Sequence, residues 1–148
     1  MQLTTAEHQA DLEAVLSGEE ILELQNLVRR VPVAEPIIRY AMQLTRMTRT
    51  GTPEAPDYVN EWVSWGAGPR ATQYLILGGK ARALLEGRFF VNTEDIRSVA
   101  HPVLRHRIVT TFSAEAEGIT PDTIVDRLIE EVGAGERAAV KEHLPDAV

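Results

Sequence analysis

Apolar residues recur at helical spacing in five separate stretches of this 148-residue chain. Before the first stretch, Ser17 and Glu20 form a capping-box pattern, and apolar positions then follow up to Pro32. The second stretch begins near Glu35 or Pro36, where proline is tolerated in the first turn of a helix. Both stretches predict amphipathic helices. The expected buried stripe of the second helix comprises Ile37, Ala41, Leu44 and Thr48.

The third stretch predicts the longest helix, which follows a turn at Gly66 to Pro69 and ends at Gly87. Gly78 and Gly79 lie inside it, and each costs about 1 kcal/mol relative to alanine. We therefore expect a neighbouring helix to approach closely there. The apolar positions expected to be buried are Ala71, Tyr74, Leu75, Gly78, Ala81 and Leu85.

Two further helices are predicted by their N-terminal residues. Asn92 is an N-cap followed by first-turn acids, and it opens a short helix that Pro102 bends or ends. The run 120–122, Thr-Pro-Asp, opens a fifth helix, and the tail after Gly133 adds one turn of helix or none. The apolar positions of these two helices are Ile96, Val99, Ala100, Ile124, Val125, Leu128, Ile129 and Val132.

Two stretches, Tyr58 to Trp65 and Arg107 to Phe112, are rich in β-branched and aromatic residues and predict a short two-stranded ribbon. Trp62 and Trp65 are expected in the core. The chain is therefore predicted to be mainly α, a small bundle of about five helices with a minor β ribbon. We expect residues 1–15 to be a linker, 16–132 the folded domain and 133–148 a tail.

Composition narrows the functional classes. The net charge of −7 disfavours a general DNA-binding surface, although residues 61–110 carry seven bases against four acids. Cysteine is absent, which removes disulfides and thiolate sites. No apolar run is long enough to span a membrane, and acids in the first twenty residues exclude a signal peptide. We expect a cytoplasmic protein without a membrane span.

Several catalytic patterns are also missing. The run 78–80, Gly-Gly-Lys, lies inside a predicted helix without a preceding strand, so it cannot form a phosphate-binding loop. No apolar strand ends in Asp-Glu to hold magnesium, and no Gly-x-Ser-x-Gly motif occurs. The four histidines lack metal-ligand spacing. We therefore predict no catalytic residue, no metal site and no enzymatic activity for this chain alone.

The turn Gly68-Pro69-Arg70 carries the most specific candidate site. It delivers an arginine to the first turn of a long helix, where free N–H groups and the helix dipole attract an anion. The planar guanidinium suits bidentate contact with phosphate oxygens. The alternative is an arginine that is merely solvated at the start of a helix. A second basic cluster comprises Arg105 to Arg107. We expect it to cap the C-terminal end of the fourth helix, and a subunit contact is the alternative.

Residues 66–71, Gly-Ala-Gly-Pro-Arg-Ala, resemble the sensor 2 segment of the MoxR branch of AAA+ ATPases. The runs at 80–88, 91–96 and 102–108 resemble the remainder of that family's lid in the same order, and the runs at 15–21 and 28–33 resemble its first helix and exit. The resemblance covers roughly residues 12–132. Two features depart from it: Gly68 stands where serine is commoner, and the loop from Thr50 to Asp57 has no close match.

The resemblance implies a helical lid that closes over ATP and Mg held by an AAA+ core domain missing from this chain. Arg70 would be the sensor 2 residue at the γ-phosphate, with Pro69 and Gly68 presenting it. It further implies an ATPase parent, a hexameric ring, a chaperone-like role and von Willebrand A-domain partners. The alternative function is a free-standing helical module that binds a protein through its acidic first and last segments, with no nucleotide role.

Overall fold

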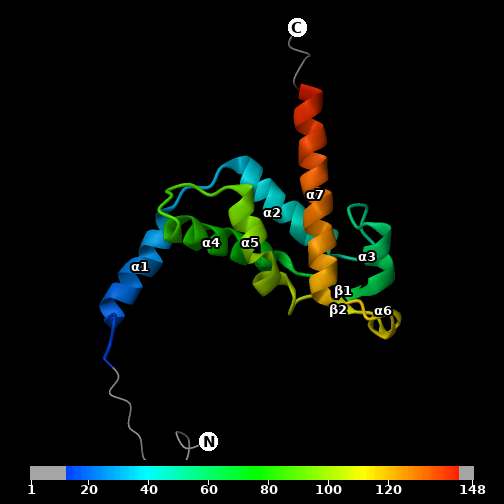
Figure 1. Ribbon diagram of the computed structural model, residues 1–148, viewed down its shortest axis with the longest axis horizontal. Helices are drawn as coiled ribbons and strands as arrows, with labels where there is room; N and C mark the ends of the chain where they lie inside the picture. The colour runs from blue at the N-terminus through cyan, green and yellow to red at the C-terminus, as the bar shows by residue number, and fades with distance from the viewer. Residues whose placement is uncertain (1–12, 144–148) are drawn as a thin grey trace, which may run out of the picture.

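The computed structural model describes the backbone of residues 13–143 and the side chains of residues 13–133. Within that range the chain forms seven helices and two short strands, as the sequence predicted for a mainly α fold with a β ribbon. The five long helices that the sequence predicts are all present (Figure 1). The elements are α1 (Gly18–Arg30), α2 (Glu35–Met47), α3 (Asp57–Trp62), β1 (Val63–Trp65), α4 (Pro69–Leu85), α5 (Thr93–Leu104), β2 (Val109–Thr110), α6 (Phe112–Ala116) and α7 (Pro121–His143).

Helix α1 starts with the predicted capping box at its outer end and runs toward the bundle, which it meets near its C-terminal end. The Glu20 backbone N–H donates to Ser17 Oγ at 3.2 Å, and the Ser17 N–H donates to the Glu20 carboxylate at 2.7 Å. No residue of α1 is buried. Figure 1 shows it projecting away from the other helices, and it packs mainly against α4. The capping box thus fixes where this helix begins, while tertiary burial contributes little to it.

Helices α4 and α5 form the closest packed pair, and the two glycines inside α4 explain how. A Cβ added at Gly79 would lie 2.8 Å from Ile96 Cδ1, and one at Gly78 would lie 3.3 Å from a Val99 methyl group. The expectation of a closely approaching helix is therefore confirmed. Burial of Ile96, which is fully covered, offsets the low helix propensity of the glycines.

The buried stripe of α4 differs from the predicted one. Its buried positions are spaced four residues apart. The prediction that Tyr74 and Leu85 are buried was wrong, since they are 48% and 84% exposed. Small side chains occupy the close contact because a large one would hold the helices apart. The buried residues are Ala71, Leu75, Gly79 and Ala83.

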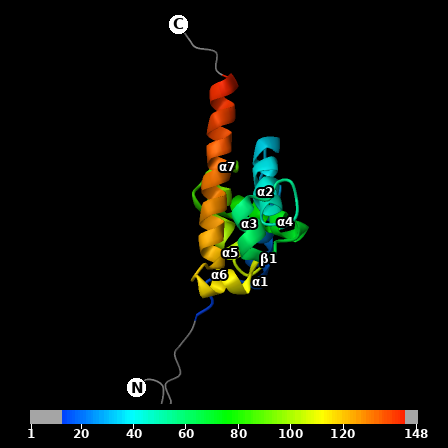
Figure 2. The same cartoon turned by 90° about the vertical axis from the view of Figure 1, so that its right-hand side faces the viewer.

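Helix α7 packs against α2 and α5 and then runs past them (Figure 2). It is longer than α4, so the prediction that α4 is the longest helix was wrong. The helix also continues through Gly133 to His143, beyond the single turn allowed for the tail. In α5, Pro102 does not end the helix, which extends to Leu104.

The two-stranded ribbon is confirmed, but it is shorter than predicted. Strands β1 and β2 pair antiparallel, with Val63 opposite Thr110. Residues 57–62 form helix α3 instead of a strand, because the helical turn buries Tyr58 and brings its ring, tilted by 52°, to 5.4 Å from the Trp62 ring. Phe112 begins α6, which Thr111 caps through a bond from the Ala114 N–H.

Trp65 is 73% exposed, so its expected place in the core was wrong, whereas Trp62 packs against the core. The division of the chain into linker, domain and tail stays a prediction. Most of the predicted linker lies in residues 1–12, outside the described part of the chain, as do residues 144–148 of the predicted tail. Among the helices of the described range, none combines the length and apolarity needed to cross a bilayer.

Candidate functional site

Arg70 lies in the first turn of α4 and is exposed to solvent. Gly68 is the N-cap residue, Pro69 occupies the first helical position, and no side chain caps this end. The Arg70 guanidinium forms no hydrogen bond or ion pair within the described residues. The structure therefore presents a free cation beside the positive end of a 17-residue helix.

The turn that carries Arg70 is fixed to the C-terminal end of α2. A Cβ on Gly66 would lie 2.1 Å from the Thr48 carbonyl oxygen, so only glycine permits this approach. The Ala67 N–H donates to Thr48 Oγ1 at 2.8 Å, and Arg49 Nε donates to the Ala67 carbonyl at 3.0 Å. Arg70 thus projects from a backbone that α2 holds in place.

Two buried hydroxyl groups extend this support into α4. Thr72 Oγ1 donates to Thr45 Oγ1 at 3.0 Å, and Thr45 in turn donates to the Ala41 carbonyl at 3.0 Å. Thr48 Oγ1 donates to the Thr45 carbonyl at 2.7 Å. Sequence reasoning placed Thr48 on the buried stripe without giving it a role, and it missed Thr45. The available signal was two threonines three residues apart on the apolar face of a helix.

A hollow of about 400 Å³ lies beside the turn, between it and the loop after α2. Gly68 and Pro69 line it, and its wall contains Arg49 but no acidic residue. A phosphate group near Arg70 would therefore meet no carboxylate from this wall. The lining residues are Arg49, Thr50, Thr52, Ser64, Trp65, Gly66, Ala67, Gly68 and Pro69.

The two arginines of the second basic cluster have different roles. Arg107 donates to the Val103 carbonyl near the end of α5, which confirms the expected capping for this residue, and its guanidinium also stacks 5.1 Å over the Tyr74 ring. Arg105 instead forms an ion pair with Asp122 at 3.1 Å, joining α5 to α7. The two arginines therefore stabilise different contacts.

His101 joins the same two helices. Its Nδ1 lies 3.1 Å from Asp122 and its Nε2 lies 2.8 Å from Asp126. Burial lowers the pKa of His101, but the hydrogen bonds to both aspartates outweigh it, so the pKa is raised overall. The arrangement is an ion-paired helix contact, and no group of three or more potential ligands for a metal occurs in the described residues.

Comparisons with known proteins agree on one family. Residues 57–128 match the family model of the AAA lid domain. The chain is 32% identical over 126 residues to Chaperone MoxR1 of Mycobacterium tuberculosis, covering 85% of this chain and 33% of that protein. It is 31% identical over 117 residues to Protein MoxR of Methylorubrum extorquens, covering 74% of this chain and 34% of that protein.

The fold has a solved counterpart in a Cytophaga hutchinsonii protein described as an ATPase. The two align with a TM-score of 0.77 and 28% identity over 86% of this chain and 39% of the other. The chain spans about a third of the length of the curated relatives it matches. The family match, the relatives and the shared fold together identify this chain as an AAA lid domain of the MoxR type.

Proposed function

We propose that this chain is the lid of a MoxR-type AAA+ ATPase and that Arg70 is its sensor 2 arginine. In this account ATP is bound and hydrolysed by an AAA+ core outside the chain, and the lid alone is not an enzyme. Arg70 reaches the γ-phosphate from the lid side and stabilises charge there. Loss of that phosphate releases the arginine and lets the lid rotate as a rigid body.

The observation that supports the proposal is that Arg70 is exposed at a helix start and makes no contact that stabilises the described fold. Its guanidinium has no partner among the described side chains, and its helix end has no side-chain cap. The turn beneath it is held by Thr48 and Arg49. Because the backbone of the turn is already held, only the arginine side chain has to be ordered when an anion arrives.

The residues present fit a phosphate but not a metal ion. Arg70 offers a planar set of donors, and Gly68 and Pro69 leave its approach open, since nothing lies within 4 Å of a Cβ added at Gly68. The hollow beside the turn contains no carboxylate to repel the anion or to bind magnesium. Any Mg²⁺ that accompanies ATP would therefore be held by the core.

The wider role is proposed from the family resemblance, and the relatives support it in part. We infer that the parent protein assembles into a ring, typically a hexamer, in which this lid contacts its own core and a neighbouring subunit. One relative is named a chaperone, and we extend a chaperone-like function to the parent of this lid. A von Willebrand A-domain protein is the proposed partner, DNA is not, and the cytoplasm is the proposed location.

The proposal is tested by substituting Arg70→Ala in a complete ATPase that carries this lid. ATP turnover at saturating ATP should fall about tenfold or more, because a charge-assisted contact made in the transition state is lost. Arg82→Ala is the matched control, since Arg82 lies at the other end of α4 and its one ion pair within the described residues is with exposed Glu86, at 2.7 Å. That control should retain full turnover. Equal turnover by the Arg70 variant and the control would remove the assignment.

A further inference from the structure

Three polar or charged side chains are buried in the described part of the chain, those of Thr45, Thr48 and Asp95. Asp95 pairs with Arg88 and completes the capping box of α5, so the fold itself accounts for its burial. The two threonines lie at the C-terminal end of α2, and their hydroxyl groups both bond to the segment around Arg70. Two of the three buried polar groups therefore converge on the candidate site.

Packing alone does not explain these two threonines. Burying a hydroxyl group costs free energy unless it is hydrogen-bonded, whereas valine has nearly the same shape without that cost. Valine would therefore fill either position in the core. The hydroxyl groups are explained by the bonds that they make. The other buried residues of α2 are Tyr40, Ala41, Leu44 and Met47.

Thr48 holds the backbone of Ala67, three residues before Arg70. Its Oγ1 donates to the Thr45 carbonyl at 2.7 Å and accepts from the Ala67 N–H at 2.8 Å. Because Ala67 is only 1% exposed, solvent has little access to this bond. Arg49 Nε donates to the carbonyl of the same residue at 3.0 Å. The turn therefore cannot rotate without leaving a buried polar group of Ala67 unpaired.

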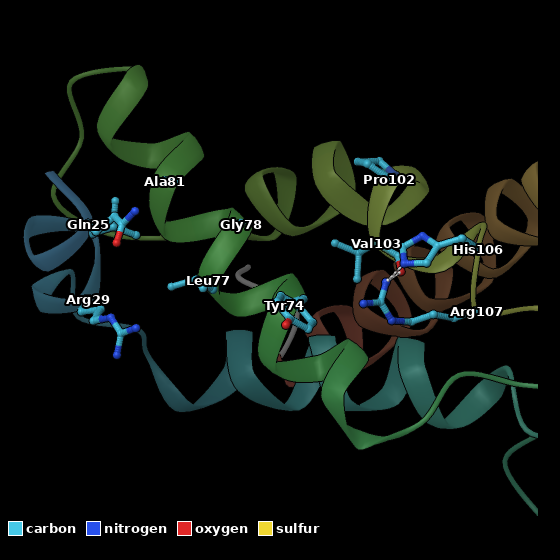
Figure 3. A pocket seen from close by; sticks show the side chains of 11 residues that line it. Gln25, Arg29, Tyr74, Leu77, Gly78, Ala81, Pro102, Val103, His106 and Arg107 are labelled. Carbon is cyan, nitrogen blue, oxygen red and sulfur yellow. Dashed lines mark hydrogen bonds between the residues drawn. The ribbon is translucent and has the colours of Figure 1, made fainter. Parts of the chain in front are cut away.

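Thr45 forms a second anchor, two residues after Arg70. Its Oγ1 accepts a hydrogen bond from Thr72 Oγ1 at 3.0 Å. Thr45 and Thr48 are three residues apart, so they lie on the same face of α2. Farther along, α4 lines a groove of about 590 Å³ that it shares with α1 and α5 (Figure 3). The two anchors thus lie at the start of α4, one on each side of Arg70 in the sequence.

We propose that Thr48 and Thr45 are positioning residues, whose buried hydroxyl groups set the direction in which Arg70 is presented to the γ-phosphate. A bidentate contact between guanidinium and phosphate requires a defined orientation, and an error of about 1 Å can cost about 100-fold in rate. The anchors restrict the backbone and leave the guanidinium free. The inference rests on the proposed role of Arg70, and it requires neither threonine to touch the nucleotide.

The affinities of a complete ATPase carrying this lid for a non-hydrolysable ATP analogue and for ADP test the inference. Thr48→Val keeps the shape of the side chain and removes the hydroxyl group. Affinity for the analogue should fall about five- to tenfold and affinity for ADP less than about twofold, because only the analogue has a γ-phosphate. Turnover at saturating ATP should fall by a similar factor. Thr48→Ser, which keeps the hydroxyl group and loses a methyl group, should retain both affinities and turnover.

Thr72→Val removes the second anchor at a half-buried position, so it tests the same inference if Thr48→Val does not fold. It should lower affinity for the analogue about threefold, with less than about twofold change for ADP. Ile96→Val is the matched control, because it removes one buried carbon atom from the α4–α5 contact. The control should lower Tm and leave both affinities unchanged. Circular dichroism shows which variants are folded at the assay temperature.

Combining Thr48→Val with Arg70→Ala separates positioning from a general loss of stability. If Thr48 acts through Arg70, its substitution should change affinity for the analogue less than about twofold once Arg70 is alanine. An undiminished effect in that background would show a merely structural role and would overturn the inference. Equal losses of analogue affinity in Thr48→Ser and Thr48→Val would also overturn it, because the hydroxyl group would then not be the cause.

The same measurements distinguish failure of the inference from failure of the proposed function. If Arg70→Ala lowers affinity for the analogue while Thr48→Val and Thr72→Val behave like the Ile96→Val control, only the positioning role is lost. If Arg70→Ala itself leaves the affinities for both nucleotides unchanged, the proposed function fails and the inference fails with it.

Discussion

Two arginines near the ends of α4 are in opposite situations, Arg70 in its first turn and Arg88 three residues after Leu85. At the C-terminal end, Arg88 donates to both carboxylate oxygens of Asp95, at 2.5 and 2.8 Å, and to Glu86 at 3.0 Å. Asp95 is only 2% exposed. At the N-terminal end, Arg70 is exposed and forms no bond to another side chain in the described range. One arginine is committed to the fold, while the other is available to a partner.

The contacts of the two side chains distinguish a structural arginine from one that is available to a ligand. Hydrogen bonding from Arg88 is the main cause of a lowered pKa at Asp95, and it prevails over burial, with further help from the Asn92 N–H. The same carboxylate completes the capping box of α5. Arg88 therefore stabilises a helix start and neutralises a buried charge. No buried or capping group in the described part of the chain depends on Arg70 in this way.

The largest expected effect on stability comes from removing the ion pair between Asp95 and Arg88. Asp95→Asn should reduce the free energy of unfolding by about 2–3 kcal/mol, because the buried bidentate pair with Arg88 is lost although the capping oxygen remains. Urea denaturation measures the change. Glu94→Gln, one position earlier and exposed, should change stability by less than about 0.5 kcal/mol.

The acid dependence of stability gives a second check on this pair. Because pairing lowers the Asp95 pKa, its contribution is present above the unfolded value near 4 and is lost as pH falls through the lower folded value. The unmodified chain should lose this contribution in acid, and Asp95→Asn should not. If the two proteins showed the same pH dependence, the pair would not stabilise the fold as described.

The next effect concerns the support beneath Arg70. Gly66→Ala should cost about 2 kcal/mol, because the new methyl group would meet the Thr48 carbonyl at 2.1 Å and force the turn away from α2. Thermal unfolding measures the loss. Gly68→Ala is the matched control, since its methyl group would meet nothing within 4 Å and should cost under about 1 kcal/mol. Equal losses from both substitutions would contradict the close approach at Gly66.

A smaller effect concerns the α5–α7 contact at His101. A raised pKa means that the charged imidazolium stabilises the fold below about pH 6.5, and that this contribution is lost as pH rises through the folded pKa. Stability should therefore decline by under about 1 kcal/mol between pH 6 and pH 8. His101→Gln should abolish that decline, whereas His106→Gln should retain it, since no carboxylate contacts His106 in the described residues.

The smallest expected effect on stability comes from removing Arg70. Arg70→Ala should leave stability unchanged or raise it by about 0.3 kcal/mol, because a cation near a helix N-terminus is mildly unfavourable. Urea denaturation of the isolated chain measures this. Destabilisation by more than about 1 kcal/mol would show that the fold uses Arg70 after all.

Local signals predicted most of the helical fold. Ser17 with Glu20, and Asn92 with Asp95, act within four residues of each other, so both helix starts could be predicted from sequence. Helix α3 could not, because Tyr58 owes its place to distant residues. Its hydroxyl donates to Glu131 at 3.1 Å, and Arg127 stacks 4.0 Å over its ring. These contacts override the β propensity of the segment.

Part of the candidate site could also be predicted from local sequence signals, and part could not. The position of Arg70 at a helix start followed from Pro69 and the turn, because those signals are local. The contact between Gly66 and Thr48 joins segments 18 residues apart, and the bond from Thr72 to Thr45 joins residues 27 apart, so neither could be predicted from periodicity. Sequence thus indicated which residue is presented, while the structure shows what holds it.

The central claim is that Arg70 contacts the γ-phosphate of ATP bound by an AAA+ core. The most direct measurement compares the affinities of a complete ATPase carrying this lid for a non-hydrolysable ATP analogue and for ADP, with and without Arg70→Ala. The account predicts that affinity for the ATP analogue falls roughly 10- to 100-fold while affinity for ADP changes less than about twofold. Equal changes for both nucleotides, or no change for either, would contradict it.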